Sequence, residues 1–333
     1  MSGAGSAARV AIEAAAGRSI ALGQRLVVCT RSRTRIAKTT GYTSRSRLKP
    51  LPQLFVRAVA TFAFATCATF ASPAFAAEAA PTALRSSSGA VSATASTTES
   101  ARAQRRSGYA YLGEELRALQ DDEFANPGLL WVDRGRKLWA RAPEGAGSCA
   151  DCHGEPESLA GVAASMPRRD PRSGGLENLQ MQINQCRSGR QNQSPWAWES
   201  EPLLAMSALI AHQSRGMPVE VEVEGPLRRA FDAGRREFER RRGQLDLSCA
   251  DCHERLAGAR LRGDVISQGM LNGFPVYRLT WQTLGSRQRM FRWCNRAVRA
   301  EPHAFGADEY LALELYLAWR SRGLPMESPA VRR

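Results

Sequence analysis

Two identical stretches, SCADCH at Ser148–His153 and SCADCH at Ser248–His253, are the most informative feature of this 333-residue sequence. Their first cysteines are 100 residues apart, and similar text surrounds both copies. An Asp-x-Gly-Arg motif precedes each copy, beginning at Asp133 and at Asp232, and an amphipathic stretch with an aromatic residue follows it. Self-similarity at matching offsets predicts that one structural unit has been duplicated.

The repeat continues beyond the two motifs into a pair of helical segments. LLAMSALIAHQSRGMPVEV (residues 203–221) matches YLALELYLAWRSRGLPMES (residues 310–328). Both have apolar residues at helical spacing, a Ser-Arg-Gly stop and a proline two residues after the glycine, which together predict a helix and its C-terminus. VEVEVEG (residues 219–225) alternates but is short, and we expect it to be an extended linker between the units. The sequence predicts a mainly α fold.

The N-terminal 76 residues have the composition of a secretory presequence. They hold eleven Lys and Arg against the single acid Glu13, which is +10 of the formal net charge of +14. The apolar stretch from Phe55 to Phe75 follows, and Ala74-Phe75-Ala76 is an A-x-A cleavage site. We expect cleavage near Ala76 and a periplasmic mature protein without stable membrane insertion. A retained N-terminal anchor and a start codon assigned too far upstream are the alternatives.

A Cys-x-x-Cys-His run behind a secretory signal is typical of a c-type haem attachment site. Two thiols three residues apart can bond to both vinyl groups of one porphyrin, while the adjacent histidine ligates the iron. A thioredoxin-like redox pair would need a βαβ context, and a zinc site would need a second cysteine pair at closing distance. We therefore expect two covalently bound haems, held by Cys149, Cys152 and His153 and by Cys249, Cys252 and His253.

Two haem sites in a repeated helical unit predict two tandem cytochrome c-like domains related by internal duplication. We expect the first domain at residues 108–220 and the second at residues 221–333. Residues 77–107 are rich in Ala, Ser and Thr and should form a flexible leader. The haem propionates offset the +4 that remains after cleavage, so the charge gives no support for a nucleic-acid partner.

The sixth iron ligand decides between electron transfer and chemistry. Methionine is the usual ligand in electron carriers, and Met217 and Met326 lie at suitable distances after the two motifs. The repeat argues against both, because Leu324 matches Met217 and Val219 matches Met326. Methionine in helices more often fills a core. His303 lies in an expected loop and is left unassigned.

Cysteine, in contrast, occupies matching places in both units. Cys186 lies 37 residues after Cys149, and Cys294 lies 45 residues after Cys249. Axial ligation of each iron by its own unit's thiolate is the favoured interpretation, and a disulfide between Cys186 and Cys294 is the alternative. A thiolate stabilises ferric iron, which makes such haems poor general carriers, and it is also a nucleophile. Sulfur chemistry is therefore expected.

With these residues the chain resembles a known family, the dihaem A subunits (SoxA) of the SoxAX cytochromes of bacterial thiosulfate oxidation. The resemblance runs from about Tyr109 to the C-terminus and includes CNRAVRAEP (residues 294–302). It implies an L-cysteine S-thiosulfotransferase that joins thiosulfate to a carrier-protein cysteine and removes two electrons. It further implies that Cys294 ligates the active-site iron and can be a persulfide, and that Cys186 ligates the other iron.

The resemblance also implies the partners, which are a SoxX-like cytochrome c subunit and a SoxYZ-like sulfur carrier protein. The family places a substrate-binding arginine four residues before the active cysteine, where this sequence has Met290. Arg289 is the best substitute within a run of arginines that should attract an anion and lower the thiol pKa of Cys294. The competing interpretations are a dihaem electron carrier resembling cytochrome c4 and a dihaem peroxidase, neither of which gives the paired thiols a role.

Overall fold

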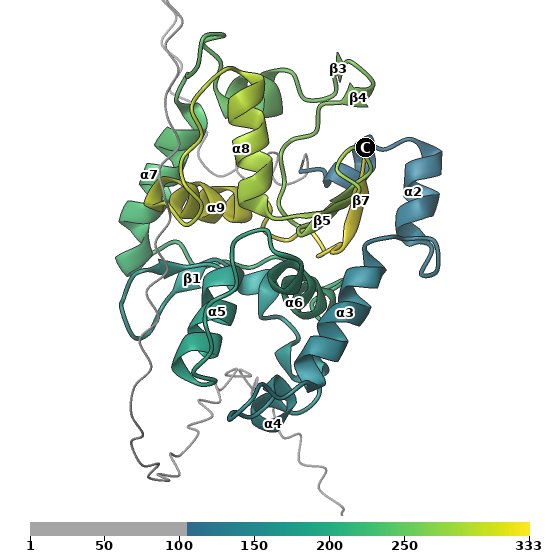
Figure 1. The fold of residues 1–333 in the computed structure, drawn as a ribbon. Helices are drawn as coiled ribbons and strands as arrows, with labels where there is room; N and C mark the ends of the chain where they lie inside the picture. The colour runs from purple at the N-terminus through teal and green to yellow at the C-terminus, as the bar shows by residue number, and fades with distance from the viewer. Residues whose placement is uncertain (1–104) are drawn as a thin grey trace, which may run out of the picture. The chain divides into compact units, whose positions relative to one another are not determined.

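The computed structural model describes residues 105–333 (Figure 1). The expected presequence and the leader up to residue 104 lie outside the described residues. Within residues 105–333, no helix has the length and apolar character needed to cross a membrane.

Helices dominate the described part of the chain, which confirms the mainly α prediction. The α-helices are α2 (Glu114–Asp121), α3 (Leu129–Ala140), α4 (Cys149–His153), α5 (Leu179–Gly189), α6 (Glu201–His212), α7 (Arg228–Glu239), α8 (Arg287–Ala297) and α9 (Asp308–Arg320). Single 3-10 or π turns are η1 (Gly108–Tyr111), η2 (Pro156–Leu159), η3 (Ala163–Ser165), η4 (Gly225–Leu227) and η5 (Asp251–Arg255). The strands are β1 (Arg168–Arg169), β2 (Leu176–Glu177), β3 (Arg260–Leu261), β4 (Asp264–Val265), β5 (Val276–Arg278), β6 (Thr283–Gly285) and β7 (Ala330–Arg332).

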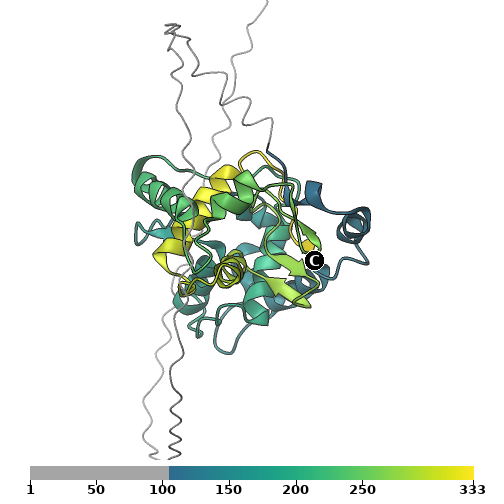
Figure 2. The same cartoon turned by 90° about the horizontal axis from the view of Figure 1, so that it is seen from above.

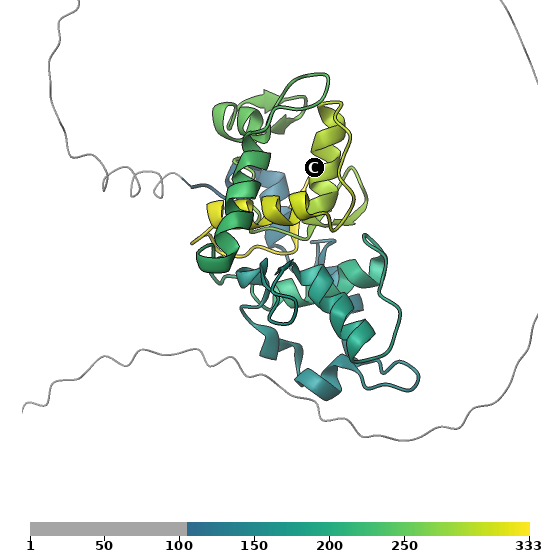
Figure 3. The same ribbon diagram turned by 90° about the vertical axis from the view of Figure 1, so that its left-hand side faces the viewer.

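Two helix crossings organise the structure: α3 packs on α6, and α7 packs on α9 (Figures 1 and 3). Each crossing depends on the glycine of an Asp-x-Gly-Arg motif. A Cβ on Gly135 would collide with the backbone carbonyl of Ala205, and a Cβ on Gly234 would collide with that of Ala312. The missing side chain lets the two backbones approach closely. The repeated glycine that the sequence displays is therefore a packing requirement.

Each crossing is surrounded by its own hydrophobic cluster. The first cluster gathers around α3 and α6, with Trp139 and Leu203 among its buried members. The second gathers around α7 and α9, with Phe238 and Tyr310 among its buried members. Burial of such side chains stabilises each crossing by about 1.5–3 kcal/mol per large residue.

Short hairpins extend from each half onto the core of the other half. In the β1–β2 hairpin Arg169 pairs with Leu176, and in the β5–β6 hairpin Tyr277 pairs with Leu284. Tyr277 and Leu284 are buried in the first cluster, although they follow the second SCADCH motif in the chain. Leu176, which follows the first motif, packs against the second cluster. The two halves are thus held together by exchanged hairpins, which the sequence did not predict because strands of two or three residues carry no clear alternation.

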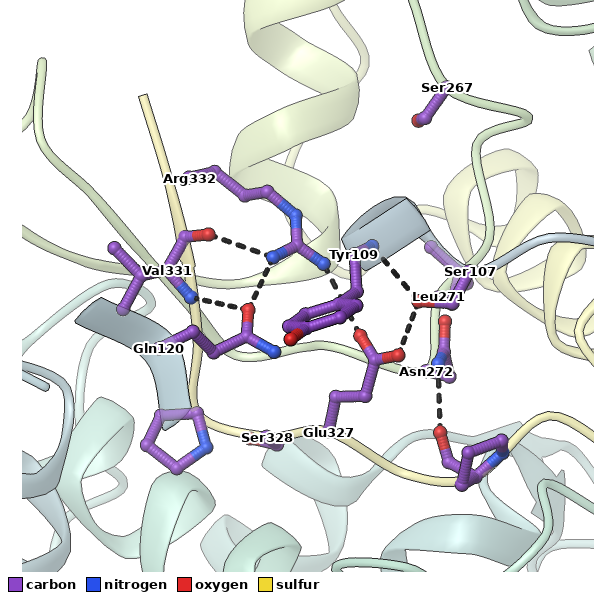
Figure 4. Close-up of polar contacts among 12 residues, drawn as sticks. Ser107, Tyr109, Gln120, Ser267, Leu271, Asn272, Glu327, Ser328, Val331 and Arg332 are labelled. Atoms are coloured by element: carbon purple, nitrogen blue, oxygen red, sulfur yellow. Dashed lines mark hydrogen bonds and ion pairs between the residues drawn. The ribbon is translucent and has the colours of Figure 1, made fainter. Parts of the chain in front are cut away.

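The end of the chain completes a three-stranded sheet, in which β5 pairs antiparallel with β6 and parallel with β7. The C-terminus lies beside these strands in Figure 2. Figure 4 shows how the start of the described chain is attached there: Ser107 bonds to Glu327, and Gln120 Oε1 accepts from the Val331 amide at 3.1 Å and from Arg332 Nη1 at 2.6 Å.

The VEVEVEG segment is extended, as predicted, and forms none of the strands of residues 105–333. Its three valines are buried while its glutamates are exposed. The Val219 amide donates to the Leu324 carbonyl, and the Glu220 amide donates to the Ala164 carbonyl, both at 2.9 Å. The segment therefore connects the two halves and also packs against both of them.

Replacing either crossing glycine should destabilise the protein. Gly135→Ala and Gly234→Ala each force two helix backbones apart, and we expect a loss of ~2 kcal/mol or more in the free energy of unfolding. Gly189→Ala is the matched control, because Gly189 is also helical and a Cβ there would meet the flexible side chain of Arg172 only at 3.9 Å. The control should be neutral or slightly stabilising. Denaturant unfolding of the haem-loaded protein measures both, and equal midpoints for all three variants would contradict the role of the crossings.

Candidate functional site

The repeated serine and aspartate of the SCADCH stretches have a structural task. The Ser148 amide donates to Asp151 Oδ2 at 2.7 Å, and the Asp151 amide donates to Ser148 Oγ at 3.1 Å. Ser248 and Asp251 repeat this arrangement at 2.8 and 3.1 Å. These reciprocal bonds cap the turn that carries the cysteines and histidine, and they lower the pKa of both aspartates. The six-residue repeat therefore combines the reactive residues with the cap that shapes their turn.

A hydrogen bond holds the ring of the second histidine. His253 Nδ1 lies 2.8 Å from the carbonyl oxygen of Ser267. Since a carbonyl only accepts, Nδ1 carries the proton and Nε2 keeps its lone pair for a metal. Near the first motif, the ring of Trp139 lies 5.7 Å from that of His153, and Trp139 Nε1 donates to the Gly154 carbonyl at 2.9 Å. Two thiols beside a histidine with a free Nε2 fit covalent attachment of haem c.

The lone cysteines lie on the two helices that follow the hairpins. Cys186 is on α5, whose N-cap Asn178 accepts from the Met181 amide, and Cys294 is on α8, whose N-cap Ser286 accepts from the Arg289 amide. All six cysteines of the described residues are free thiols, including Cys186 and Cys294.

Each lone thiol lies beside the motif of its own half. Burial, and then the nearby Cys186, raise the pKa of Cys149 to about 11. Burial, and then the nearby Cys249, raise the pKa of Cys294 to about 12. A neighbouring thiolate raises the pKa of a thiol because like charges repel, and this repulsion is strong only at short distance. Cys186 and Cys294 therefore each lie within electrostatic range of the CxxCH motif in their own half, and their ligation of iron stays a prediction.

The two methionines considered as iron ligands, Met217 and Met326, have other surroundings. Met326 is buried in a third cluster with Ala163, Ala164, Ala211 and Val219. Met217 is exposed, with its Cε near Gly161.

The expectation that nearby arginines lower the thiol pKa of Cys294 is wrong, because that pKa is raised. The arginines that are close to Cys294 in the sequence bind other groups instead of the thiol. Arg292 bonds to the carbonyl of His303, and Arg299 Nη1 donates to Gln244 Oε1 at 3.4 Å. Burial therefore outweighs the positive charges, and among the described arginines Arg278 of β5 is the one that lowers the pKa of this thiol.

Arg289, the expected substrate-binding residue, is engaged on another face of α8. Its Nη1 donates to the Leu284 carbonyl at 3.3 Å and lies 4.0 Å from a carboxylate oxygen of Glu199. Its guanidinium carbon lies 4.4 Å from the ring centroid of Trp281. Its role in substrate binding remains a prediction.

A buried charge cluster beside the second motif was missed by sequence analysis. Glu237 is 5% exposed, bonds to Arg242, and lies 2.9 Å from His303 Nε2. Arg242 lowers and Glu237 raises the pKa of Cys249, which places the cluster next to that thiol. A pocket of about 400 Å³ is lined in part by Arg242 and His303. The sequence did contain one indication of this cluster, because Glu237 is a charged residue at the position where the first repeat has the apolar Leu138.

One buried carboxylate joins the two cysteine-bearing helices. Glu314 of α9 accepts from Asn178 Nδ2 at 2.9 Å and from Gln288 Nε2 at 2.8 Å, so that it contacts the start of α5 and of α8. Its other oxygen lies 3.6 Å from Arg287 Nη1. Burial raises the pKa of Glu314 and lowers that of Arg287, despite their ion pair. In the first half the equivalent residue is Ser207. Its Oγ donates to the Leu203 carbonyl within its own helix.

Comparison with known proteins identifies close relatives of this chain. The family described as SoxA/TsdA, cytochrome c domain, matches residues 134–219. The L-cysteine S-thiosulfotransferase subunits SoxA of Rhodovulum sulfidophilum and Paracoccus pantotrophus are each 42% identical, over 68% of this chain and over 80% and 78% of their own. The crystal structure of SoxXA from P. pantotrophus has a similar fold, with a TM-score of 0.67 and 41% identity over 69% of this chain and 87% of that chain.

Removing the shared carboxylate should destabilise the protein more than removing its repeat counterpart. Glu314→Ala leaves the buried Arg287 without its partner, and we expect a loss of ~3 kcal/mol in the free energy of unfolding. Ser207→Ala removes one hydrogen bond within a helix and should cost ~1 kcal/mol. Denaturant unfolding of the haem-loaded variants compares them. Equal losses would mean that Glu314 does not hold the two helices.

Proposed function

This chain belongs to the family of SoxA subunits of L-cysteine S-thiosulfotransferases, and on that basis we propose that it conjugates thiosulfate to a cysteine of a carrier protein. In this reaction the carrier thiol and the outer sulfur of thiosulfate form a new S–S bond, and one proton and two electrons are released. The observation that carries the proposal is the position of Cys294, a partly buried thiol on α8 beside Cys249 of its own CxxCH motif.

The cytochrome c domain implies covalently bound haem c, and we assign two haems to the chain. The first is attached at Cys149 and Cys152, and the second at Cys249 and Cys252. His153 and Cys186 ligate the first iron, and His253 and Cys294 ligate the second. Support comes from the matching capped turns and from the lone thiol that lies beside each motif. Bound haem supplies the route by which electrons leave.

The two haems belong to two cytochrome c-like domains that arose by duplication, residues 108–220 and 221–333. The equivalent glycine crossings support this division, as do the equivalent hairpin registers before α5 and α8. The exchanged hairpins give the domains a shared interior.

Catalysis is confined to the second domain, where Cys294 acts as the sulfur-handling thiol and can carry a persulfide. Its raised pKa means that the unligated thiol keeps its proton at neutral pH. Ligation to a metal removes that proton, because a coordinating thiol is deprotonated. Partial burial then limits the contact of this sulfur with bulk solvent.

The proposal includes partners and a compartment. The similar crystal structure from P. pantotrophus is that of SoxXA, and a SoxX-like cytochrome c subunit is the expected partner that takes up electrons. A SoxYZ-like protein presents the carrier cysteine. The enzyme works in the periplasm after cleavage of its presequence near Ala76.

Two covalent haems per chain can be counted directly. Acid–acetone extraction should leave all haem absorbance on the polypeptide, with two haems per chain by pyridine haemochrome assay. Cys149→Ala combined with Cys152→Ala should remove one of the two and spare the other. Release of haem into the organic phase would reject the assignment.

Cys294→Ala should abolish thiosulfate conjugation while both haems stay attached, because attachment needs only the CxxCH thiols. Cys186→Ala, the matched change in the first domain, should alter the spectrum of the first haem and retain much of the activity. Mass spectrometry of the carrier protein after turnover measures conjugation. If the Cys294→Ala enzyme conjugates thiosulfate at the wild-type rate, the proposed activity is rejected in favour of an electron carrier.

A further inference from the structure

Arg278 brings a positive charge to the face of α8 that carries Cys294. It is the last residue of β5, and its Nη1 lies 3.5 Å from the sulfur of Met290. Met290 is one helical turn before Cys294, so the two side chains share a face of α8. Arg278 and Cys294 also affect each other's pKa. A strand thus places a guanidinium where the helix itself has only a thioether.

Arg278 is buried, but the Nη edge of its guanidinium is weakly bonded. The residue is 8% exposed. Its Nε donates at 2.8 Å to a main-chain oxygen of Arg333, the last residue of the sequence. Its Nη2 lies 3.9 Å from Asp264, at the limit of an ion pair, and its Nη1 faces only the weak acceptor of Met290. The donors of this edge are therefore suited to an anionic ligand.

The surrounding rings suit this role. The guanidinium carbon lies 5.2 Å from the ring centroid of Trp281 and 5.0 Å from that of Trp293. Trp293 precedes the active thiol and is 43% exposed, so this wall of the site reaches the surface. Aromatic faces hold an arginine in place while leaving the edge of its fork free to donate.

The first domain has no arginine at the equivalent position, although Arg172 and Arg190 partly offset the burial that raises the pKa of Cys186. The hairpin registers pair Arg168 with Glu177 and Val276 with Gly285, which makes Asp170 the counterpart of Arg278. The Asp170 carboxylate accepts from the Arg172 amide at 2.9 Å and from Ser173 Oγ at 2.7 Å. An acidic residue at this position would repel an anion. This difference between Arg278 and Asp170 agrees with the proposed function, in which Cys294 and not Cys186 handles sulfur.

We propose that Arg278 binds the sulfonate oxygens of thiosulfate beside Cys294, an inference that rests on the proposed function of that thiol. A guanidinium fork matches two oxygens of a sulfonate group, and the outer sulfur of thiosulfate is then directed toward the thiol. Arg278 of β5 thereby supplies the charge that α8 lacks at Met290.

The test compares Arg278→Gln and Arg278→Lys with wild type in the haem-loaded complex with its cytochrome partner. We expect KM for thiosulfate to rise about tenfold or more in Arg278→Gln, with kcat little changed, because a charge-assisted ground-state contact is lost. Arg278→Lys keeps the charge without the fork and should give an intermediate KM. Calorimetric titration with thiosulfate should show the same order of Kd.

Two further variants make the outcome decisive. Arg172→Gln removes the arginine that most lowers the pKa of Cys186 and should leave KM unchanged. Arg289→Gln tests the other candidate, and a rise in KM there with none in Arg278→Gln or Arg278→Lys would overturn the proposal. A lost or altered second haem with an unchanged Kd for thiosulfate would assign Arg278 to the haem and also overturn it. If Arg278→Gln does not fold, a wild-type KM in Arg278→Lys rejects the proposal.

The binding measurement separates this inference from the proposed function. Wild-type protein that binds thiosulfate through Arg278 but conjugates none would reject the activity and keep the binding site. Protein that conjugates thiosulfate with unaltered Kd in both Arg278 variants would keep the activity and reject the site.

Discussion

The close crossing of two helices at a glycine is the contact on which the rest of this structure depends. At Gly135 over Ala205, and again at Gly234 over Ala312, a backbone carbonyl occupies the space that a side chain would need. The crossing sets the distance between the helix before each SCADCH turn and the closing helix after it. Each hydrophobic cluster forms around one crossing, and each cluster then receives apolar residues from the hairpin of the other half. A loosened crossing would therefore affect both SCADCH turns.

On this repeated frame, a few changes distinguish the two sites. Glu314 replaces Ser207 and reaches the starts of both cysteine-bearing helices, which gives α5 and α8 a common anchor. Arg278 replaces Asp170 and brings a positive charge to Cys294. Such polar residues are expensive to bury unless they have partners. Because these residues are present in only one half, the two SCADCH sites differ in their surroundings, which agrees with the proposed difference in their tasks.

The environment of Cys294 shows why local charge is a poor guide to thiol chemistry. Arginines crowd the sequence around this residue, yet helical geometry sends them to different faces, where they bind carbonyls and aromatic rings. Burial then raises the thiol pKa. A neutral thiol that becomes a thiolate only on ligation suits a metal-bound sulfur better than a freely reactive one.

The sequence by itself determined the repeat, the haem-binding motifs, the lone thiol of each half and the mainly α fold. These features are encoded by residue type and spacing over short stretches, such as the capped turn of Ser148 and Asp151, and local encoding can be recognised in one chain. The hairpin exchange, the Glu314 anchor, the Glu237 cluster and the approach of Arg278 were decided only by the tertiary structure. Each joins residues that are distant along the chain, and neither periodicity nor composition specifies which distant side chains will meet when the cores close.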